Sequence, residues 1–362
     1  MTPAPTQERD CGPQGAATIR AYRLRNRNRW LLLLLLGLAL CATLILGLTL
    51  GPFPTPPLEV VQALLPGLPW GEADPRSAHI VRNIRLPRLA TAGLAGAGLA
   101  LAGVILQTLL RNPMASPFTL GFSSGASLGA ALVIITGFSA FGLAGIVIHA
   151  FLGALLVSLI ILAMGHWKGA TPTALILTGV ALMYFFNAAT TLLIYFSDVY
   201  ATREVLFWTV GSLSRAGWDS TLYIALALML TLPAFLYWAP GLNRLLLGDA
   251  SARSLGLAVG RLRVGLILLV ALLVATVVSF TGGIGFLGLV APHLARMLIG
   301  TDHRFLIPAT ALLGALLLML ADLVSLHAFP DTILPVGVVT AFLGSPLFIY
   351  LILRRREGAP AI

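Results

Sequence analysis

A series of long, continuously apolar runs is the feature that most restricts what this chain can fold into. About 20 apolar residues are needed to cross the hydrocarbon of a bilayer as an α-helix. The runs do not alternate apolar and polar residues, as the strands of an outer-membrane barrel would. The approximate spans are 31–50, 88–110, 118–138, 142–164, 174–196, 221–240, 264–281, 284–299, 306–326 and 334–353. The sequence therefore predicts an all-α integral membrane protein with about ten transmembrane helices.

The composition agrees with a surface that faces lipid. Of the 362 residues, 58% are hydrophobic and 10% are charged, whereas a soluble domain carries charge on about a quarter of its residues. The net charge of +10 does not indicate nucleic-acid binding, because no basic stripe is interleaved with aromatic residues. The arginines gather instead at the ends of the apolar runs, where lipid headgroups are expected.

The distribution of basic residues predicts the orientation in the membrane. With the N-terminus inside, seventeen of the 23 basic residues lie in the cytoplasm and six lie outside. We therefore expect a multi-pass protein of the inner (cytoplasmic) membrane, with both termini cytoplasmic.

The ends of the chain differ from the apolar region. We expect residues 1–30 to be a disordered, arginine-rich cytoplasmic leader, 31–355 to be the transmembrane domain and 356–362 to be a cytoplasmic tail. The first run is longer than the apolar core of a signal peptide and lacks an A-x-A cleavage site, so we expect it to be retained as a helix. Cys11 and Cys41 lie in the leader and in this run, and no disulfide framework is predicted.

Patterns that carry catalysis or bind metal are missing from the sequence. Lys168 is followed by Gly169, so the chain has no phosphate-binding loop and cannot hydrolyse ATP by that route. The segment Gly121–Gly125 misses the G-x-S-G pattern of an intramembrane serine protease by one position, and the histidines show no metal-binding spacing. We therefore predict no catalytic residue, no metal site and no cofactor.

Acidic residues within apolar runs cost free energy in the membrane and usually have a function. Asp322 lies within a run, and Asp198 lies at the end of another. A proton-coupled carrier generally needs a relay of such groups. A single acid near a helix end is more often a structural acceptor for backbone or hydroxyl donors, which makes an ion-coupled secondary transporter the less favoured class.

Three polar segments between the runs are candidates for function. The first, Asn243–Gly256, can form a short helix that Asp249 caps and that Gly256 closes in the left-handed conformation. Leu255 and Leu257 would then be apolar knobs suited to the groove of a partner. An ordinary amphipathic connector would have the same features, so the residues alone leave both interpretations open.

The second segment contains two arginines three residues apart. Arg85 and Arg88 would share one face of a helical start. They could grip carboxylates of an external partner, or they could anchor the chain to lipid headgroups.

The third segment, Arg111–Pro117, contains two prolines between two spans. It is either a simple turn or a constriction. In the second case, small movements of Asn112 and Met114 would open or close a path.

Five separated groups of motifs occur in order along the chain. They are L-P-R-L…G-x-x-L-Q-T-L-L-R-N-P-M-A-S-P with the L-G-F-S-S-G-A that follows, Gly248–Gly256, Gly283–His293, Thr301–Arg304 and Leu334–Thr340. In this order and spacing they resemble the permease family of type II ABC importers for ferric siderophores, haem and cobalamin. The resemblance covers about residues 31–355.

The resemblance implies partners and roles for particular residues. It implies two permease copies, as a homodimer, around a central path, with two cytoplasmic ATP-binding cassette subunits and an extracytoplasmic substrate-binding protein. Arg85 and Arg88 match arginines that engage acidic residues of that binding protein. The residues that match the helix seated in the ATPase, here called the coupling helix, are Gly248, Asp249, Ala252, Arg253, Leu255 and Gly256. Asn112 and Met114 match one cytoplasmic gate, and Thr171 and Thr173 lie where another is expected.

One position departs from the family pattern. After Ala321 and Asp322 the family often carries a further outward-facing arginine, whereas this chain has Leu326 with His327 beside it. A third contact with the binding protein is therefore not expected here.

The resemblance implies import driven by ATP hydrolysis in a partner subunit. We expect an iron–siderophore complex as the substrate because such systems are numerous, with haem, cobalamin or an oxyanion as alternatives for the same machinery. An ion-coupled carrier, which would work alone, and an intramembrane enzyme are the competing classes.

Overall fold

The computed structural model describes residues 13–51, 53–65, 71, 73–137, 144–167, 171–329 and 332–353. Within these ranges the regular structure is helical throughout. The elements are α1 (Pro13–Thr49), α2 (Pro57–Leu64), α3 (Pro75–His79), η1 (Ile80–Arg85), α4 (Leu86–Leu109), α5 (Phe122–Thr136), α6 (Gly145–Trp167), α7 (Pro172–Tyr195), α8 (Val199–Val210), α9 (Trp218–Tyr237), α10 (Ala239–Leu245), α11 (Asp249–Ser254), α12 (Val259–Thr281), α13 (Leu287–Ile299), α14 (His303–His327) and α15 (Val336–Leu353).

Each of the ten predicted spans corresponds to an apolar helix, which confirms the expected all-α membrane fold. Among the described residues, seven helices are long and apolar enough to cross a membrane, and three shorter apolar helices, in α5, α13 and α15, complete the set. Helix α13 has 13 residues and is about 20 Å long. The chain from Gly282 to Phe286 before it is not helical, and α13 starts at Leu287.

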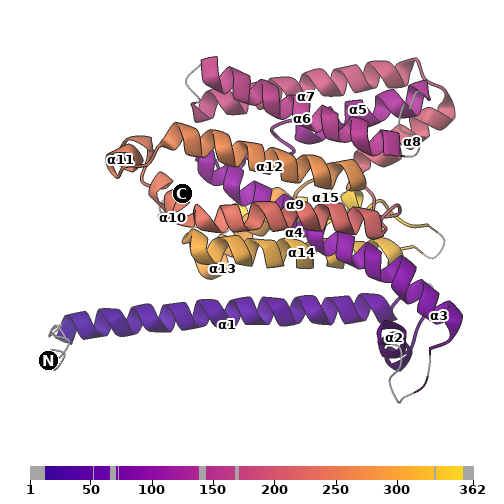
Figure 1. Ribbon diagram of the computed structural model, residues 1–362, viewed down its shortest axis with the longest axis horizontal. Coiled ribbons are helices and arrows are strands. Elements are labelled where there is room, and N and C mark those ends of the chain that lie inside the picture. The colour runs from indigo at the N-terminus through magenta and orange to yellow at the C-terminus, as the bar shows by residue number, and fades with distance from the viewer. Residues whose placement is uncertain are drawn as a thin grey trace, which may run out of the picture.

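The expected disordered leader is wrong for residues 13–30. Helix α1 runs without interruption from Pro13 to Thr49, so this part of the leader continues the first membrane helix (Figure 1). Arginine, alanine and leucine favour helix, and after Gly15 no glycine or proline interrupts the helix before Gly37. Residues 1–12 and the predicted tail, 356–362, lie outside the described residues.

The second predicted span begins earlier than expected. Its helix starts at Pro75, where the Asp74 carboxylate accepts hydrogen bonds from the backbone N–H groups of Arg76 and Ser77. It then passes through the π-helical turn η1 and continues as α4. Arg85 and Arg88 therefore lie inside a long helix and not at its start.

Helix α4 lies at the centre of the bundle and packs on α9, α12, α13 and α14 (Figure 1). Glycine permits the closest approaches. A Cβ atom on Gly96 would lie 2.2 Å from the carbonyl oxygen of Gly314, and one on Gly103 would lie 2.0 Å from that of Gly288. These glycines therefore permit tight helix packing.

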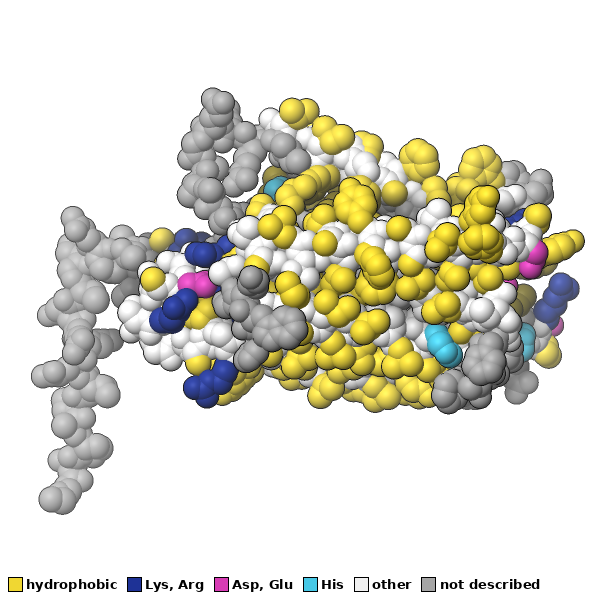
Figure 2. Space-filling model, turned by 90° about the horizontal axis from the view of Figure 1, so that it is seen from above, with side chains coloured by type: hydrophobic (Ala, Val, Ile, Leu, Met, Phe, Trp, Pro, Cys, Tyr) yellow, Lys and Arg dark blue, Asp and Glu magenta, His cyan; other side chains and the backbone are white. Residues whose placement is uncertain are grey.

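The surface of the bundle is apolar along its length and charged at its two ends (Figure 2). Large hydrophobic side chains such as Leu34, Leu177 and Leu230 are more than half exposed, as expected for helices that contact lipid. We call the end that carries α11 and the start of α1 the α11 end. The opposite end, which carries α2 and α3, is the α3 end (Figure 1).

Candidate functional site

The short helix predicted between two spans is present as α11 at the α11 end. Gly248 precedes it with a φ of 98°. Gly256, with a φ of 80°, closes it, as predicted: its N–H donates to Arg253 O (2.9 Å), and the N–H of Leu257 donates to Ala252 O (3.0 Å). Left-handed glycines at both ends thus set off α11 from the neighbouring chain.

Two details of this helix differ from the prediction. Asp249 is its first residue, and its carboxylate faces arginine side chains instead of capping the helix. Leu257 is 8% exposed and packs in the core, so it is not an apolar knob. Arg253 and Leu255 do project from the surface, with 69% of the Arg253 side chain and 54% of Leu255 exposed.

Three guanidinium groups surround the Asp249 carboxylate. Nη2 of Arg263 donates to both oxygens at 3.2 Å. Nε of Arg111 lies 4.0 Å from Oδ1, and Nη2 of Arg253 lies 4.0 Å from Oδ2. Because the Arg263 side chain is 4% exposed, Asp249 is its essential counter-charge.

Arg111 joins this cluster from the loop that was predicted to form a gate. Its φ of 47° is left-handed, a conformation that a residue with a long side chain adopts only under local constraint. Its Nη1 lies 3.5 Å from the point that a Cβ atom on Gly248 would occupy. The predicted gate loop therefore contacts the start of α11 directly.

The same loop holds Asn112 and Met114. The Asn112 side-chain oxygen accepts a hydrogen bond from the Met114 N–H (2.9 Å), and the Asn112 N–H donates to Gln107 O (3.1 Å) at the end of α4. These bonds tie the loop to α4, whereas the Met114 side chain is 49% exposed.

Two adjoining cavities connect three of the four predicted gate residues, all but Met114, with the predicted coupling helix. Asn112 and Thr173 line a cavity of about 480 Å³, together with Arg111, Pro172 and Arg296. Thr171 lines a second cavity of about 720 Å³ with Asp249 and Arg253, and this cavity shares Arg111 and Pro172 with the first. Thr171 also caps α7 by accepting a hydrogen bond from the Ala174 N–H (3.4 Å).

A buried polar network lies next to these cavities and was not predicted. His303 is 1% exposed, and its Nε2 lies 2.8 Å from the Thr108 hydroxyl oxygen. Its Nδ1 lies 2.7 Å from Oδ1 of Asn243, whose Nδ2 donates to Asp302 (2.9 Å). The network joins α4, α10 and α14.

Asp302 ends this network, and its charge is stabilised there. Burial alone would raise the pKa of its carboxyl group. The hydrogen bonds from Asn243 and from the backbone of Arg304, together with the charge of Arg29, outweigh burial and hold the pKa below its usual value. Arg29 therefore connects α1 electrostatically to the start of α14.

At the α3 end, Arg85 is turned into its own chain. Its side chain is buried, and its guanidinium donates to the carbonyl oxygens of Leu48 (2.6 Å) and Phe53 and to the hydroxyl of Thr55 (3.2 Å). These bonds hold the connection between α1 and α2. In this structure the Arg85 guanidinium is engaged within its own chain, and its contact with an external binding protein stays a prediction.

Arg88 is also unavailable at the surface. Its Nε lies 3.1 and 3.0 Å from the two Asp322 carboxylate oxygens, and its Nη2 lies 2.8 Å from Oδ1. The exposed fraction is 13% for the Arg88 side chain and 0% for that of Asp322. Asp322 is thus a structural acceptor, but for a guanidinium and not for backbone or hydroxyl donors. The presence of two lone opposite charges in separate apolar runs is the signal that could have predicted this pair.

Other residues that the sequence singles out at the α3 end have local surroundings. Asp198 caps α8 by accepting hydrogen bonds from the N–H groups of Tyr200 (2.8 Å) and Ala201 (3.0 Å). Leu326 is half-buried, and Nδ1 of the exposed His327 lies 2.8 Å from Leu323 O.

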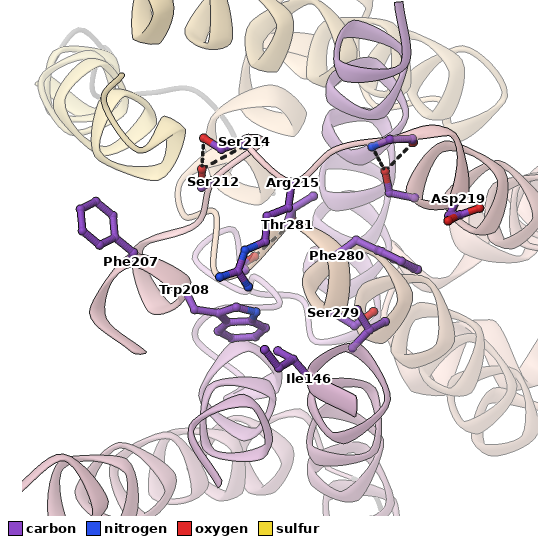
Figure 3. A pocket seen from close by; sticks show the side chains of 14 residues that line it. Ile146, Phe207, Trp208, Ser212, Ser214, Arg215, Asp219, Ser279, Phe280 and Thr281 are labelled. Carbon is purple, nitrogen blue, oxygen red and sulfur yellow. Dashed lines mark hydrogen bonds between the residues drawn. The ribbon is translucent and has the colours of Figure 1, made fainter. Parts of the chain in front are cut away.

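A cavity of about 440 Å³ at the α3 end was not predicted. Ile146, Phe207, Trp208 and Ser279 surround it, and Arg215 points into it (Figure 3). The Arg215 guanidinium is paired with Glu204 at 2.6 Å, so the cation that enters this cavity already has a counter-charge. Among the described residues, no group of three or more His, Cys, Asp or Glu side chains could hold a metal ion.

Comparisons with known proteins agree on one class. A model of the FecCD transport family matches residues 38–354. The hemin transport system permease protein HmuU of Yersinia pestis is 44% identical over 283 residues, which is 77% of this chain and 84% of that protein. The molybdate import system permease protein MolB of Haemophilus influenzae is 35% identical, over 89% of this chain and 95% of that protein.

A solved structure has the same fold. It is described as an inward-facing conformation of a metal-chelate type ABC transporter, and it is similar with a TM-score of 0.79 and 33% identity. The similarity covers 89% of this chain and 99% of that one. The match therefore includes most of this chain.

Proposed function

The chain belongs to the FecCD transport family, and on this basis we propose that it is the permease of an ATP-driven importer for an iron–siderophore complex. As an ABC permease it is a transport subunit and not an enzyme. ATP would be hydrolysed by two separate cassette subunits that bind at the α11 end. A substrate-binding protein would dock at the α3 end, and two permease copies would enclose the path as a homodimer.

This arrangement makes the α11 end cytoplasmic. The arginines of α1, α11 and α12 gather there, as the positive-inside rule requires. The described residues contain an even number of apolar helices, which places the end of α15 on the same side.

The observation that carries the proposal is the contact between the predicted gate loop and the predicted coupling helix. Arg111 lies against Gly248 and Asp249, and it lines both cavities that contain Asn112, Thr171 and Thr173. A cassette subunit that moved α11 would therefore move Arg111 with it. A change in nucleotide state could thus switch the gate between two packings of the same helices.

The substrate is the most specific part of the proposal. The description of one similar structure as a metal-chelate type transporter supports an iron–siderophore complex. The names of two relatives, which refer to hemin and molybdate, support haem and an oxyanion as alternatives, and cobalamin is a further alternative by resemblance. The test is to measure which metal chelate the cognate binding protein binds and delivers.

Coupling is tested by reconstitution of the chain with its cassette subunits and binding protein in liposomes. Arg253→Glu and Leu255→Asp should abolish ATP-driven uptake, because both side chains project from α11. Arg304→Glu is the matched control, since Arg304 is an exposed arginine at the same end outside α11. Normal uptake by both α11 variants would contradict the proposal. Sustained uphill accumulation of substrate in liposomes that contain this chain alone would also contradict the proposal.

A further inference from the structure

The cavity of about 720 Å³ at the α11 end has an unusual balance of charge. Arg111, Arg253, Arg261 and Arg263 line it, and Asp249 is the single acidic residue among its lining residues. We call this cavity the arginine chamber. Four arginines and one aspartate line the chamber, so its side chains carry more positive than negative charge.

The arginines of the chamber come from three separate segments. Arg111 belongs to the loop after α4, Arg253 to α11, and Arg261 and Arg263 to the first turn and a half of α12. A row of snorkelling arginines on one helix would simply reach the headgroup region. Here three segments instead place arginines around one open cavity, and one of these cations, Arg263, is almost fully buried.

The Asp249 carboxylate shows where these groups converge. Three of the four guanidiniums lie within 4.0 Å of its two oxygens. Only Arg263, at 3.2 Å, is within hydrogen-bonding distance, so Arg111 and Arg253 are close enough for attraction but make no hydrogen bond to it. Their planar groups therefore have donors that a second anion in the chamber could use.

We propose that the arginine chamber binds an oxyanion of the phosphate type. Guanidinium groups bind phosphate oxygens with paired, charge-assisted hydrogen bonds, and several of them together offer more donors than a single carboxylate can accept. Free phosphate, a phosphate ester and the headgroup of an anionic lipid share this chemistry. The bound anion would bridge Arg111 of the gate loop and Arg253 of α11, and so hold these two elements together.

The binding test uses the full chain, purified in maltoside detergent without lipid, and titration calorimetry with inorganic phosphate at constant ionic strength. The wild type should bind phosphate saturably at one site. Arg111→Gln and Arg261→Gln should each weaken binding by about tenfold, because each removes a charged donor. Arg304→Gln, which removes an exposed arginine at the same end outside the chamber, should leave binding unchanged.

A second arm distinguishes the sources of the phosphate group. Native mass spectrometry after addition of phosphatidylglycerol should show retained lipid in the wild type and its loss in Arg111→Gln if a headgroup occupies the chamber. Either phosphate binding or lipid retention with this dependence on Arg111 supports the proposal. This test needs no cassette subunit, so its outcome is independent of the proposed transport function.

Two results would overturn the inference. One is equal weakening of binding by Arg304→Gln, which would show a general attraction to a basic surface. The other is the absence of both phosphate binding and lipid retention in the wild type.

Discussion

Arg88 and Asp322 form a two-pronged ion pair between α4 and α14, with both carboxylate oxygens within 3.1 Å of the guanidinium. The Asp322 side chain is fully buried, and that of Arg88 is 13% exposed. Each charge therefore depends on the other for its stability. This pair fixes the ends of the two helices that pack most extensively in the bundle.

Removal of one partner should destabilise the protein. Asp322→Asn leaves the Arg88 guanidinium without its counter-charge, and we expect a cost of about 3–5 kcal/mol in the free energy of unfolding. The double variant Arg88→Met with Asp322→Leu should recover most of that loss, because it removes both charges. Thermal unfolding in detergent, followed by tryptophan fluorescence, measures the stability of the single and the double variant. A single variant as stable as the wild type would show that the pair is not structural.

The stability of the central helix packing should depend on the size of the side chain at position 103. Gly103→Ala places a methyl carbon 2.0 Å from the carbonyl oxygen of Gly288, so α4 and α13 must separate. We expect a loss of about 1–3 kcal/mol. Gly265→Ala on α12 is the matched control, since nothing lies within 4 Å of its Cβ position, and it should gain about 0.5–1 kcal/mol from helix propensity. Equal melting temperatures for the two variants would contradict this account of the packing.

The sequence was sufficient to predict the ten apolar helices, because each is encoded locally by a run of apolar residues. It also predicted α11 and the closing role of Gly256, since a left-handed glycine is a local signal. It failed for residues 13–30, where charge suggested disorder but the uninterrupted helix formers favoured continuation of α1.

The arginine sites show where sequence reasoning reached its limit. The sequence does not predict the internal contacts of Arg85 and Arg88: Arg85 binds backbone carbonyls more than 30 residues away, and Arg88 pairs with Asp322 at a separation of 234 residues. The same holds for Asp249, whose partners Arg111 and Arg263 come from different segments. Such pairings depend on tertiary contacts that no local pattern records.

The two roles of α11 can be separated by mutation. Asp249→Asn removes the charge that compensates the buried Arg263, and we expect a loss of about 1.5–3 kcal/mol in stability. Arg253→Gln breaks an exposed ion pair of 4.0 Å, which should cost less than about 1 kcal/mol. In transport assays, by contrast, both variants should be impaired. If Arg253→Gln were as destabilising as Asp249→Asn, Arg253 would be part of the folded core and its assignment to a partner would fail.

The predicted gate can be probed from either side of the membrane with a thiol reagent that cannot cross the bilayer. In a background with Cys11→Ser and Cys41→Ser, single Asn112→Cys and Thr173→Cys variants place a thiol in the cavity of about 480 Å³ that both residues line. Because this cavity lies at the α11 end, both thiols should react with reagent supplied on the cytoplasmic side and stay protected from reagent on the opposite side.

The same variants report on gating once the cassette subunits are present. If a change in nucleotide state closes the gate, the modification rate of both cysteines should fall by about tenfold, whereas a cysteine at the exposed Arg304 position should react at a constant rate. Modification from the opposite side would reverse the proposed orientation. Rates that are unaffected by nucleotide in an assembly that transports would show that Asn112 and Thr173 do not form the gate.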